Sequence, residues 1–215
     1  DQTAGRVPVY AGTGAITTRE VIELNEIAEK AGVNAVSIIT PYFIKPSQDE
    51  LYEHYKTIAK ATKLPILLYS NPARTGITLS VSIVERCGDM TLTDEYIRST
   101  LDKEFYVLAG RDTLILATLM YGGYGSIAAC ANVAPKLVAS IYDYFIKGDI
   151  ESAKQAQRAL APLRIAFDLG TFPVVIKEAL KIIGIDAGPA RAPIKGLSQE
   201  KKEELKQILK NMNLA

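Results

Sequence analysis

Up to Asn132, short apolar runs alternate along the chain with longer segments in which apolar residues recur every three or four positions. The short runs are typical of buried strands and the longer segments of amphipathic helices. Strands are predicted at residues 7–11, 35–40, 64–69, 105–109 and 126–131. Helices are predicted at residues 17–31, 47–62, 79–86, 93–101 and 113–121. This alternation predicts βα units around a parallel sheet.

The alternation stops after Asn132, where four helices are predicted in succession, at residues 134–147, 150–167, 172–183 and 198–211. One earlier position also breaks it, because nothing in residues 87–92 resembles a buried strand, although a βα series requires one between two helices. Helix starts are marked by Thr17 or Thr18, by Ser80, and by Ser47, which forms a capping-box pair with Glu50. The pattern therefore predicts a parallel α/β sheet followed by a helical appendix.

Composition narrows the classes of function. The 215 residues carry 25 basic and 24 acidic side chains, and the net charge of +1 gives no electrostatic footprint for nucleic acid. No apolar stretch is long enough for a membrane span. The start of the sequence has neither a signal-peptide pattern nor an initiator Met, so we expect a longer gene product. The two cysteines lack metal-site spacing and suit a reducing cytoplasm, and the single histidine, His54, is expected at the surface or boundary.

The most informative stretch follows the third predicted strand. That strand ends at Tyr69, the chain turns through Asn71-Pro72, and Arg74 precedes Thr75-Gly76. A phenol at a strand end with a guanidinium five residues later suits proton transfer beside a substrate that carries a carboxylate. A core tyrosine and a surface arginine explain the same residues equally well, so the chemistry stays open on this pattern alone.

Other strand ends carry further candidates. The segment 11–14, Ala-Gly-Thr-Gly, lacks the third glycine of a dinucleotide cradle and is better interpreted as a loop that needs small residues. The aromatic loop at residues 40–46 suits either a pocket or an interface. Residues 110–112 offer backbone amides and a carboxylate, and residues 125–132 offer small residues for a close ligand approach, although both segments also fit plain strand boundaries. Because all these segments follow strands, they are expected on the ligand-binding face of the sheet.

With these motifs together, the chain resembles the dihydrodipicolinate synthase / N-acetylneuraminate lyase family, which consists of pyruvate-dependent class I aldolases on a TIM (β/α)8 barrel. The resemblance runs nearly from end to end, and its most specific string is Tyr69-x-x-Pro72-x-Arg74-Thr75-Gly76. The other matching strings lie at residues 5–14, 40–46, 109–112 and 125–135. The resemblance implies a partial (β/α) barrel over residues 1–133, with about five of eight strands, and C-terminal helices over residues 134–215.

The resemblance also implies roles for single residues. Tyr69 is expected to relay protons while an imine forms between pyruvate and a lysine, and Arg74 to bind the carboxylate of the second substrate. The main chain at Ile127 is expected to line the pyruvate pocket, and Gly110 and Asp112 to lie near the distal substrate. The aromatic pair Tyr42 and Phe43 is expected at a dimer interface. No metal and no dissociable cofactor is implied, because pyruvate is held covalently as the imine.

Three departures from the family pattern stand out. The family's imine lysine lies at the end of a strand that precedes a Ser-Gly-Asp string, and only Gly88-Asp89 remains here, at the position where the periodicity lacks a strand. The first two βα units of the family are also not represented in the sequence. The synthases usually carry a second tyrosine where this chain has Phe43, and a phenyl ring cannot carry a proton.

The resemblance implies a Schiff-base, pyruvate-dependent lyase or synthase of the aldolase type. Arg74 favours a dihydrodipicolinate synthase that condenses pyruvate with aspartate semialdehyde, in lysine biosynthesis. Phe43 favours an aldolase or dehydratase for 2-keto-3-deoxy sugar acids, and the missing lysine leaves a third alternative, an inactive homologue that binds a keto acid. The implied partners are small keto acids and aldehydes in the cytoplasm, without nucleic acid or membrane, and the implied assembly is a homotetramer built as a dimer of dimers.

Overall fold

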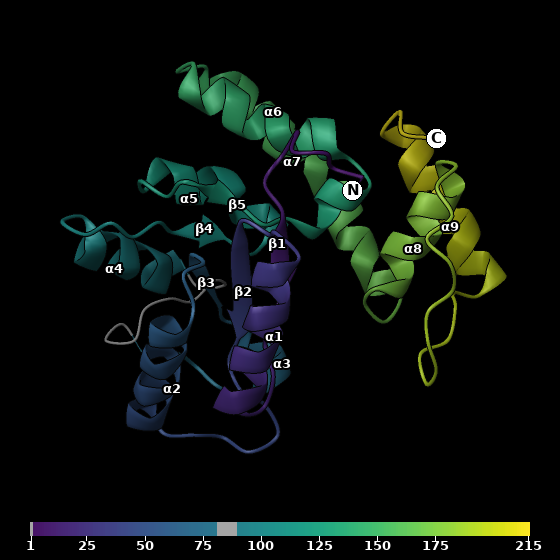
Figure 1. Cartoon of the computed structure of the whole chain (residues 1–215). Helices are drawn as coiled ribbons and strands as arrows, with labels where there is room; N and C mark the ends of the chain where they lie inside the picture. Colours follow the sequence, from purple (N-terminus) through teal and green to yellow (C-terminus); the bar gives the residue numbers. More distant parts are fainter. Residues whose placement is uncertain (1, 81–89) are drawn as a thin grey trace. The chain divides into compact units, whose positions relative to one another are not determined.

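The computed structural model of the chain describes residues 2–80 and 90–215 (Figure 1). They form two compact units, Asp1–Lys103 and Glu104–Ala215. This division by compactness differs in kind from the predicted division at residue 133, which separates a barrel from helices by topology and stays a prediction. Each unit is described separately below.

The first unit holds a parallel three-stranded sheet in the order β1-β2-β3. Its strands are β1 (Tyr10–Gly12), β2 (Ala35–Ile39) and β3 (Ile66–Tyr69). Its helices are α1 (Thr18–Lys30), α2 (Gln48–Ala61), the single turn α3 (Pro72–Thr75) and α4 (Met90–Thr100). The register pairs Gly12 with Ser37 and Ile39 with Tyr69. The strand–helix alternation and the parallel pairing predicted from the sequence are therefore confirmed in this unit.

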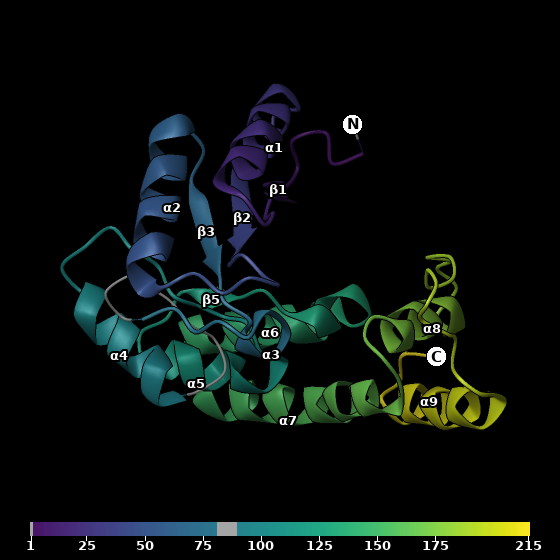
Figure 2. The ribbon, with the colours of Figure 1, turned by 90° about the horizontal axis from the view of Figure 1, so that it is seen from below.

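Helices α1 and α2 begin at capping boxes and lie side by side along one face of the sheet (Figures 1 and 2). The α2 box joins Ser47 to Glu50, as predicted, and Thr17 with Glu20 forms the same motif before α1. Each box satisfies two of the backbone N–H groups that a helix start leaves without partners. The apolar faces of both helices bury a core that includes Ile38, which is fully inaccessible to solvent.

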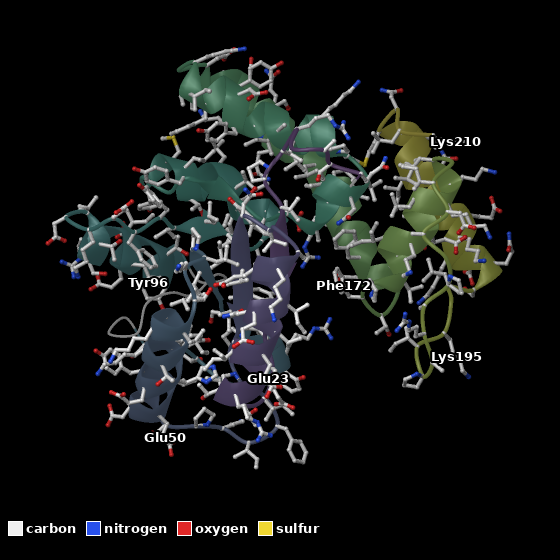
Figure 3. All side chains as sticks on the ribbon, in the orientation of Figure 1. Glu23, Glu50, Tyr96, Phe172, Lys195 and Lys210 are labelled. Atoms are coloured by element: carbon white, nitrogen blue, oxygen red, sulfur yellow. The ribbon has the colours of Figure 1, made fainter. Side chains whose placement is uncertain are left out.

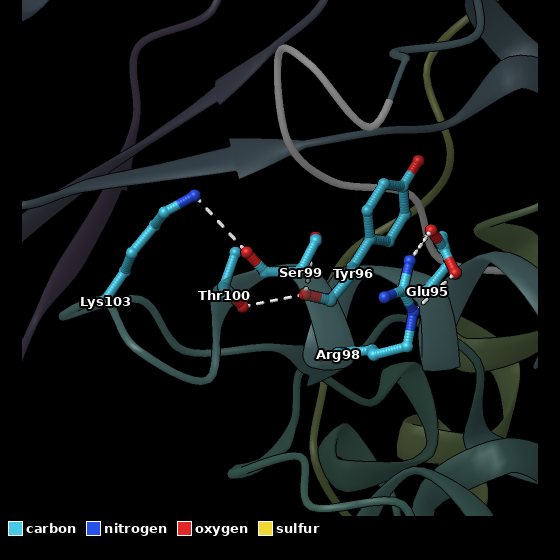
Figure 4. Close-up of polar contacts among 6 residues, drawn as sticks. All are labelled: Glu95, Tyr96, Arg98, Ser99, Thr100 and Lys103. Atoms are coloured by element: carbon cyan, nitrogen blue, oxygen red, sulfur yellow. Dashed lines mark hydrogen bonds and ion pairs between the residues drawn. The ribbon is translucent and has the colours of Figure 1, made fainter.

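Helix α4 is anchored to the segment that precedes residue 81. The Tyr96 side chain is fully buried, and its hydroxyl donates to the Leu79 carbonyl oxygen at 3.2 Å. Along the same helix, the Thr100 hydroxyl donates to the Tyr96 carbonyl, and Arg98 pairs with Glu95 (Figure 4). The helix predicted at residues 79–86 is not seen at residues 79 and 80, which are not helical, and its remaining residues lie outside the described part.

The second unit holds a short parallel pair, β4 (Leu108–Ala109) and β5 (Gly125–Ser126), and a group of helices. The α-helices are α5 (Ile115–Met120), α6 (Pro135–Ile146), α7 (Ile150–Ala166), α8 (Val174–Ile182) and α9 (Gln199–Asn211). Three 3-10 turns, η1 (Asp112–Leu114), η2 (Ala129–Asn132) and η3 (Phe167–Leu169), complete the described elements of this unit. The predicted succession of C-terminal helices is confirmed within two residues at each end.

Helix α7 is the central element of the second unit and runs from α5 to α9 (Figure 2). Its buried residues include Leu160 and Leu163, both fully inaccessible, and they join the core formed with α6, α8 and α9. Charged side chains such as Lys195 and Lys210 lie on the outside of this helical part (Figure 3). Each of these helices contributes buried apolar residues to this core, as expected for amphipathic helices.

Predictions about local structure differ from the structure at three places. The strand predicted at 105–109 is formed only at residues 108–109. The strand predicted at 126–131 is a two-residue strand at 125–126 followed by the turn η2, because the small residues there do not favour extended backbone as β-branched ones do. His54 is buried, with 8% of its surface exposed, although its charged neighbours suggested a surface or boundary position. Its Nδ1 lies 2.8 Å from the Thr18 hydroxyl, so the α1–α2 contact encloses it.

Candidate active site at the strand ends

Tyr69 is the last residue of β3, and its side chain points away from the helices. Its partner in the sheet is Ile39, whose neighbour Ile38 lies in the core against α1 and α2. Because side chains alternate between the two faces of a sheet, Ile39 and Tyr69 project from the opposite face. The Tyr69 ring is 43% exposed, so its phenol is open to a ligand on that face.

The turn after β3 holds the phenol through Asn71. The Asn71 Nδ2 group donates to the Tyr69 hydroxyl oxygen at 2.9 Å. Asn71 also occupies the N-cap position of α3, yet its side chain makes no capping hydrogen bond. Since an asparagine there usually accepts from the helix start, the side chain is committed to the phenol instead. A phenol oxygen that accepts this bond keeps its own O–H free to donate elsewhere.

Arg74 lies in α3 and is exposed. The turn closes at Gly76, which has φ of +70°, a left-handed conformation that favours glycine. A Cβ atom at Gly76 would lie 2.8 Å from Lys45 Cε and 3.0 Å from Lys45 Nζ. The Lys45 side chain therefore passes directly over the turn that carries Arg74. Two cationic side chains thus belong to neighbouring strand-end segments, one after β2 and one after β3.

The aromatic loop after β2 is among the most exposed apolar parts of the first unit. Phe43 is 90% exposed and has φ of +77°, while Tyr42 is 43% exposed and Ile44 is 72% exposed. A contiguous group of apolar side chains this exposed to water is typical of a surface that binds another molecule. The geometry suits a surface that another molecule covers, and the predicted place of Tyr42 and Phe43 at a dimer interface stays a prediction.

The segment after β1 needs small residues, as its sequence indicated. A Cβ atom at Gly14 would lie 2.6 Å from Ile39 Cγ2 and 2.8 Å from the Ile39 backbone nitrogen. Such distances are too short for any side chain, so the loop passes over β2 only because residue 14 is glycine. The interpretation of residues 11–14 as a close-packed strand-end loop, rather than a dinucleotide cradle, agrees with this contact.

In the second unit, Gly110 and Asp112 follow β4. Gly110 is exposed, whereas only 3% of Asp112 is exposed. Asp112 Oδ1 accepts from the Cys130 backbone N–H at 2.7 Å, and its Oδ2 lies 3.7 Å from Arg164 Nε. The carboxylate was predicted near the distal substrate. Its observed partners are protein groups on both oxygens.

Ile127 follows β5 and extends the pairing of the two strands, because its backbone N–H donates to the Ala109 carbonyl at 2.9 Å. Since β4 and β5 are parallel, Gly110 and Ile127 lie at the same end of this pair. In the first unit, the parallel sheet likewise brings Tyr69, Arg74 and the loop of Tyr42 to one end. The clustering at carboxyl ends of strands is therefore confirmed within each unit.

No described strand ends in a lysine, and the residues around Gly88, where the family pattern expects one, lie outside the described part. Over the same described ranges, no three His, Cys, Asp or Glu side chains group as a metal ion would require, and no helix is long and apolar enough to cross a membrane. A pocket of about 330 Å³ lies between α8, the following loop and α9, and is lined by residues such as Lys177 and Lys202. None of the predicted site residues lines that pocket.

Sequence reasoning missed three side chains that contact candidate site residues: Asn71, which contacts Tyr69, and Gln157 and Arg164, which contact Asp112. Asn71 stands two residues after Tyr69, where only a turn was expected. Gln157 and Arg164 are seven residues apart on α7, two turns along one helix face that also carries Leu160. Polar residues at this spacing on an otherwise apolar face were the available signal for a buried polar contact.

Comparison with known proteins identifies the relatives of this chain. A model of the dihydrodipicolinate synthetase family matches residues 1–212. The 4-hydroxy-tetrahydrodipicolinate synthase of Archaeoglobus fulgidus is 38% identical over 222 residues, covering 97% of this chain and 76% of the relative. The synthase of the same name from Thermodesulfovibrio yellowstonii is 39% identical with the same coverage.

Solved structures give the same result. The dihydrodipicolinate synthase of Thermotoga maritima superposes with a TM-score of 0.94 at 31% identity and covers 99% of this chain and 78% of its own. A prophage protein of the dihydrodipicolinic acid synthase family from E. coli K12, solved in complex with pyruvate, also has a TM-score of 0.94, at 29% identity, covering 100% of this chain and 78% of its own. This chain thus spans roughly three quarters of the length of the relatives that it matches.

Proposed function

The chain belongs to the dihydrodipicolinate synthetase family, and on that premise we propose that it acts as a 4-hydroxy-tetrahydrodipicolinate synthase that condenses pyruvate with aspartate semialdehyde. The family consists of (β/α)8-barrel lyases and synthases that hold pyruvate as an imine on a lysine, without a metal cofactor. The fold class and the reaction class expected from the sequence are therefore confirmed. The second substrate is the part that we propose.

The observation that carries the proposal is the turn after β3, where an exposed Tyr69 phenol is followed by an exposed Arg74. In the proposed reaction, Tyr69 donates a proton to the departing hydroxyl when the imine forms and takes it back when the imine is hydrolysed. Asn71 supports this role, because its hydrogen bond leaves the phenol proton free. Arg74 binds the carboxylate of aspartate semialdehyde, for which a guanidinium has the matching geometry.

In the second unit, main-chain groups make the proposed contacts with pyruvate and with the second substrate. The Ile127 backbone lines the pyruvate pocket, and Gly110 lies beside the second substrate. Both positions are the carboxyl ends of parallel strands, where barrel enzymes bind their substrates. The absence of a side chain at Gly110 lets a small ligand approach the chain closely.

Phe43 favours a second candidate, an aldolase or dehydratase for 2-keto-3-deoxy sugar acids. The synthases usually carry a tyrosine there that serves the proton relay of a neighbouring subunit, and Phe43 has no hydroxyl. The 90% exposure of Phe43 fits a ring that another subunit covers. We propose a cytoplasmic homotetramer built from such dimers, although one solved relative is described as a monomeric variant.

A direct test is to incubate the chain with pyruvate, reduce it with borohydride and measure the intact mass. A pyruvate-handling enzyme gains the mass of one reduced pyruvate, and peptide mapping then locates the modified lysine. Turnover with aspartate semialdehyde, compared with a 2-keto-3-deoxy sugar acid, separates the two candidates. Pyruvate binding without an adduct would support a catalytically inactive keto-acid-binding homologue, and no binding at all would overturn the proposal.

A further inference from the structure

We infer that Asp112 is a positioning residue, held from α7 by Gln157 and Arg164, and that it acts by fixing the backbone of the strand-end loop that carries Ile127. The expectation from the family resemblance was that Asp112 lies near the distal substrate. The expected effect on pyruvate binding rests on the proposed function. The positioning of the loop by Asp112 rests only on contacts within the second unit.

The carboxylate of Asp112 has protein partners on both oxygens. Its Oδ1 accepts from the Cys130 N–H at 2.7 Å, a short distance typical of a charge-assisted bond. Its Oδ2 faces Arg164 Nε at 3.7 Å, and only 4% of the Asp112 side chain is exposed. A substrate would have to displace one of these partners to reach the carboxylate, and that would leave a buried charge or amide without a partner.

Gln157 fixes the main chain around the same residue. Its Nε2 donates to the Asp112 carbonyl at 2.8 Å, and its Oε1 accepts from the Leu116 N–H at 3.0 Å. Leu116 lies in the first turn of α5, where backbone N–H groups have no partner within the helix. The Gln157 side-chain amide therefore satisfies the Leu116 N–H, which has no partner within α5. Its two bonds, to residues 112 and 116, also attach η1 to α7.

Arg164 supplies the compensating charge. Its guanidinium lies 5.4 Å from the centre of the Phe167 ring, and 28% of its side chain is exposed, so the cation is packed on one side and hydrated on the other. Burial raises the pKa of the neighbouring Cys130 thiol, and the Asp112 carboxylate raises it further. The thiol thus stays protonated and is no nucleophile, so we assign the Cys130 residue a role through its contacts with Asp112 rather than through thiolate chemistry.

These contacts form a continuous path from α7 to the predicted pyruvate pocket. Gln157 and Arg164 hold Asp112, Asp112 holds the Cys130 amide, and the short segment before Cys130 begins at Ile127. The Ile127 N–H is in turn fixed to the Ala109 carbonyl, at the end of β4. One buried carboxylate therefore links the loop after β4 to the loop after β5, so both keep the spacing that a small ligand needs.

The test compares Asp112→Asn, Gln157→Leu and Arg164→Met with the control Arg158→Met, an exposed residue of the same helix. Asparagine keeps an oxygen that accepts from Cys130 but removes the charge. We expect the Cys130 amide proton to move upfield in the NMR spectrum of Asp112→Asn and the Ile127 amide to exchange faster in all three variants. The KM for pyruvate should rise about tenfold, as for other residues that orient a site indirectly, with kcat changed less than about twofold.

Two results would overturn the inference. One is an unchanged Cys130 amide signal in Asp112→Asn; the other is a raised KM for the second substrate alone, which would indicate direct contact with that substrate. If Asp112→Asn does not fold, exchange of the Ile127 amide and the KM for pyruvate in Gln157→Leu test the inference with the carboxylate intact, and unchanged values of both would overturn it. A wild-type chain that takes up no pyruvate would refute the proposed function, while the amide signals would still decide whether Asp112 positions the loop.

Discussion

Candidate site residues lie both in the turn after β3, in the first unit, and in the paired loops after β4 and β5, in the second, but the two regions are built in opposite ways. In the turn, Tyr69 and Arg74 are open to solvent, and the contact that orients the phenol comes from Asn71, two residues away. In the paired loops, Asp112 is buried and held by side chains more than forty positions later on α7. The first region is set by local sequence and the second by tertiary contacts.

This difference follows from what each region contributes. A side chain that transfers protons or binds a substrate carboxylate must reach the ligand, so it cannot be fully enclosed before the ligand arrives. A backbone group that shapes a pocket has no rotamers of its own and is only as well placed as the loop that carries it. Changes in the first region should therefore alter chemistry more than stability, and changes in the second should alter stability first.

The largest effect on stability is expected for Asp112→Ala. This change leaves the Cys130 N–H without an acceptor and Arg164 without its counter-charge, and breaking a buried pair in this way costs about 3 kcal/mol. Urea denaturation measures the loss. Asp143→Ala, at an exposed position on α6, is the control and should change the free energy of unfolding by less than about 0.5 kcal/mol. Equal losses in both variants would contradict the contrast between the regions.

Tyr69→Phe should have the opposite profile. It removes the phenol O–H and should slow formation of the reduced pyruvate adduct about 100-fold, the lower range for a general acid–base group. The free energy of unfolding should stay within about 0.5 kcal/mol, because the side chain is exposed. Tyr52→Phe, at an exposed tyrosine of α2, controls for loss of a hydroxyl elsewhere. If the pyruvate adduct forms at an unchanged rate in Tyr69→Phe, Tyr69 does not transfer the proton.

Gly76→Ala tests how firmly the turn itself is held. Its left-handed backbone costs a residue with a side chain about 1–2 kcal/mol, and here the new methyl group also meets Lys45. Gly148→Ala is a matched control, because Gly148 has φ of +78° but open space where the methyl group would lie. Comparing the two free energies of unfolding isolates the contact with Lys45. If both variants lose the same amount, Lys45 simply moves aside.

Asn71→Ala should lower the free energy of unfolding by less than about 1 kcal/mol, since it removes one solvent-accessible hydrogen bond. The pyruvate adduct should form about threefold more slowly, because half a kcal/mol or so of orientation at the phenol is lost. Asn71→Asp sharpens the test, since a carboxylate only accepts and would draw the phenol proton toward itself. A faster reaction in Asn71→Asp than in Asn71→Ala would contradict this role for Asn71.

The smallest effect concerns pH and involves the first unit alone. Burial lowers the pKa of His54, so the unfolded chain binds a proton below about pH 6.5 more readily than the folded chain does. The free energy of unfolding should therefore fall as the pH is lowered from 7 to 5, in a window above the range where carboxylates titrate. His54→Gln should flatten that slope in denaturation experiments. An equal slope in the variant would assign the effect to other groups.

The sequence alone determined the alternation of strands and helices, the parallel order and the position of Tyr69 at a strand end. These features follow from hydrophobic periodicity, capping boxes and turn residues, all of which act within a few positions along the chain. The specific string from Tyr69 to Gly76 also led to the family. The strands predicted at 105–109 and 126–131 are each only two residues long, because strand length depends on pairing with the partner strand as well as on local sequence.

Only the tertiary structure decided which polar residues are enclosed. His54 is buried because α1 packs on α2, and Asp112 is buried because Gln157 and Arg164 approach it from a helix that no local pattern links to it. The sequence presents Tyr69 and Asp112 alike, as polar residues near strand ends. Burial separates them, since it depends on the apolar surface that distant segments remove from water, and that sum is fixed only when the whole unit has folded.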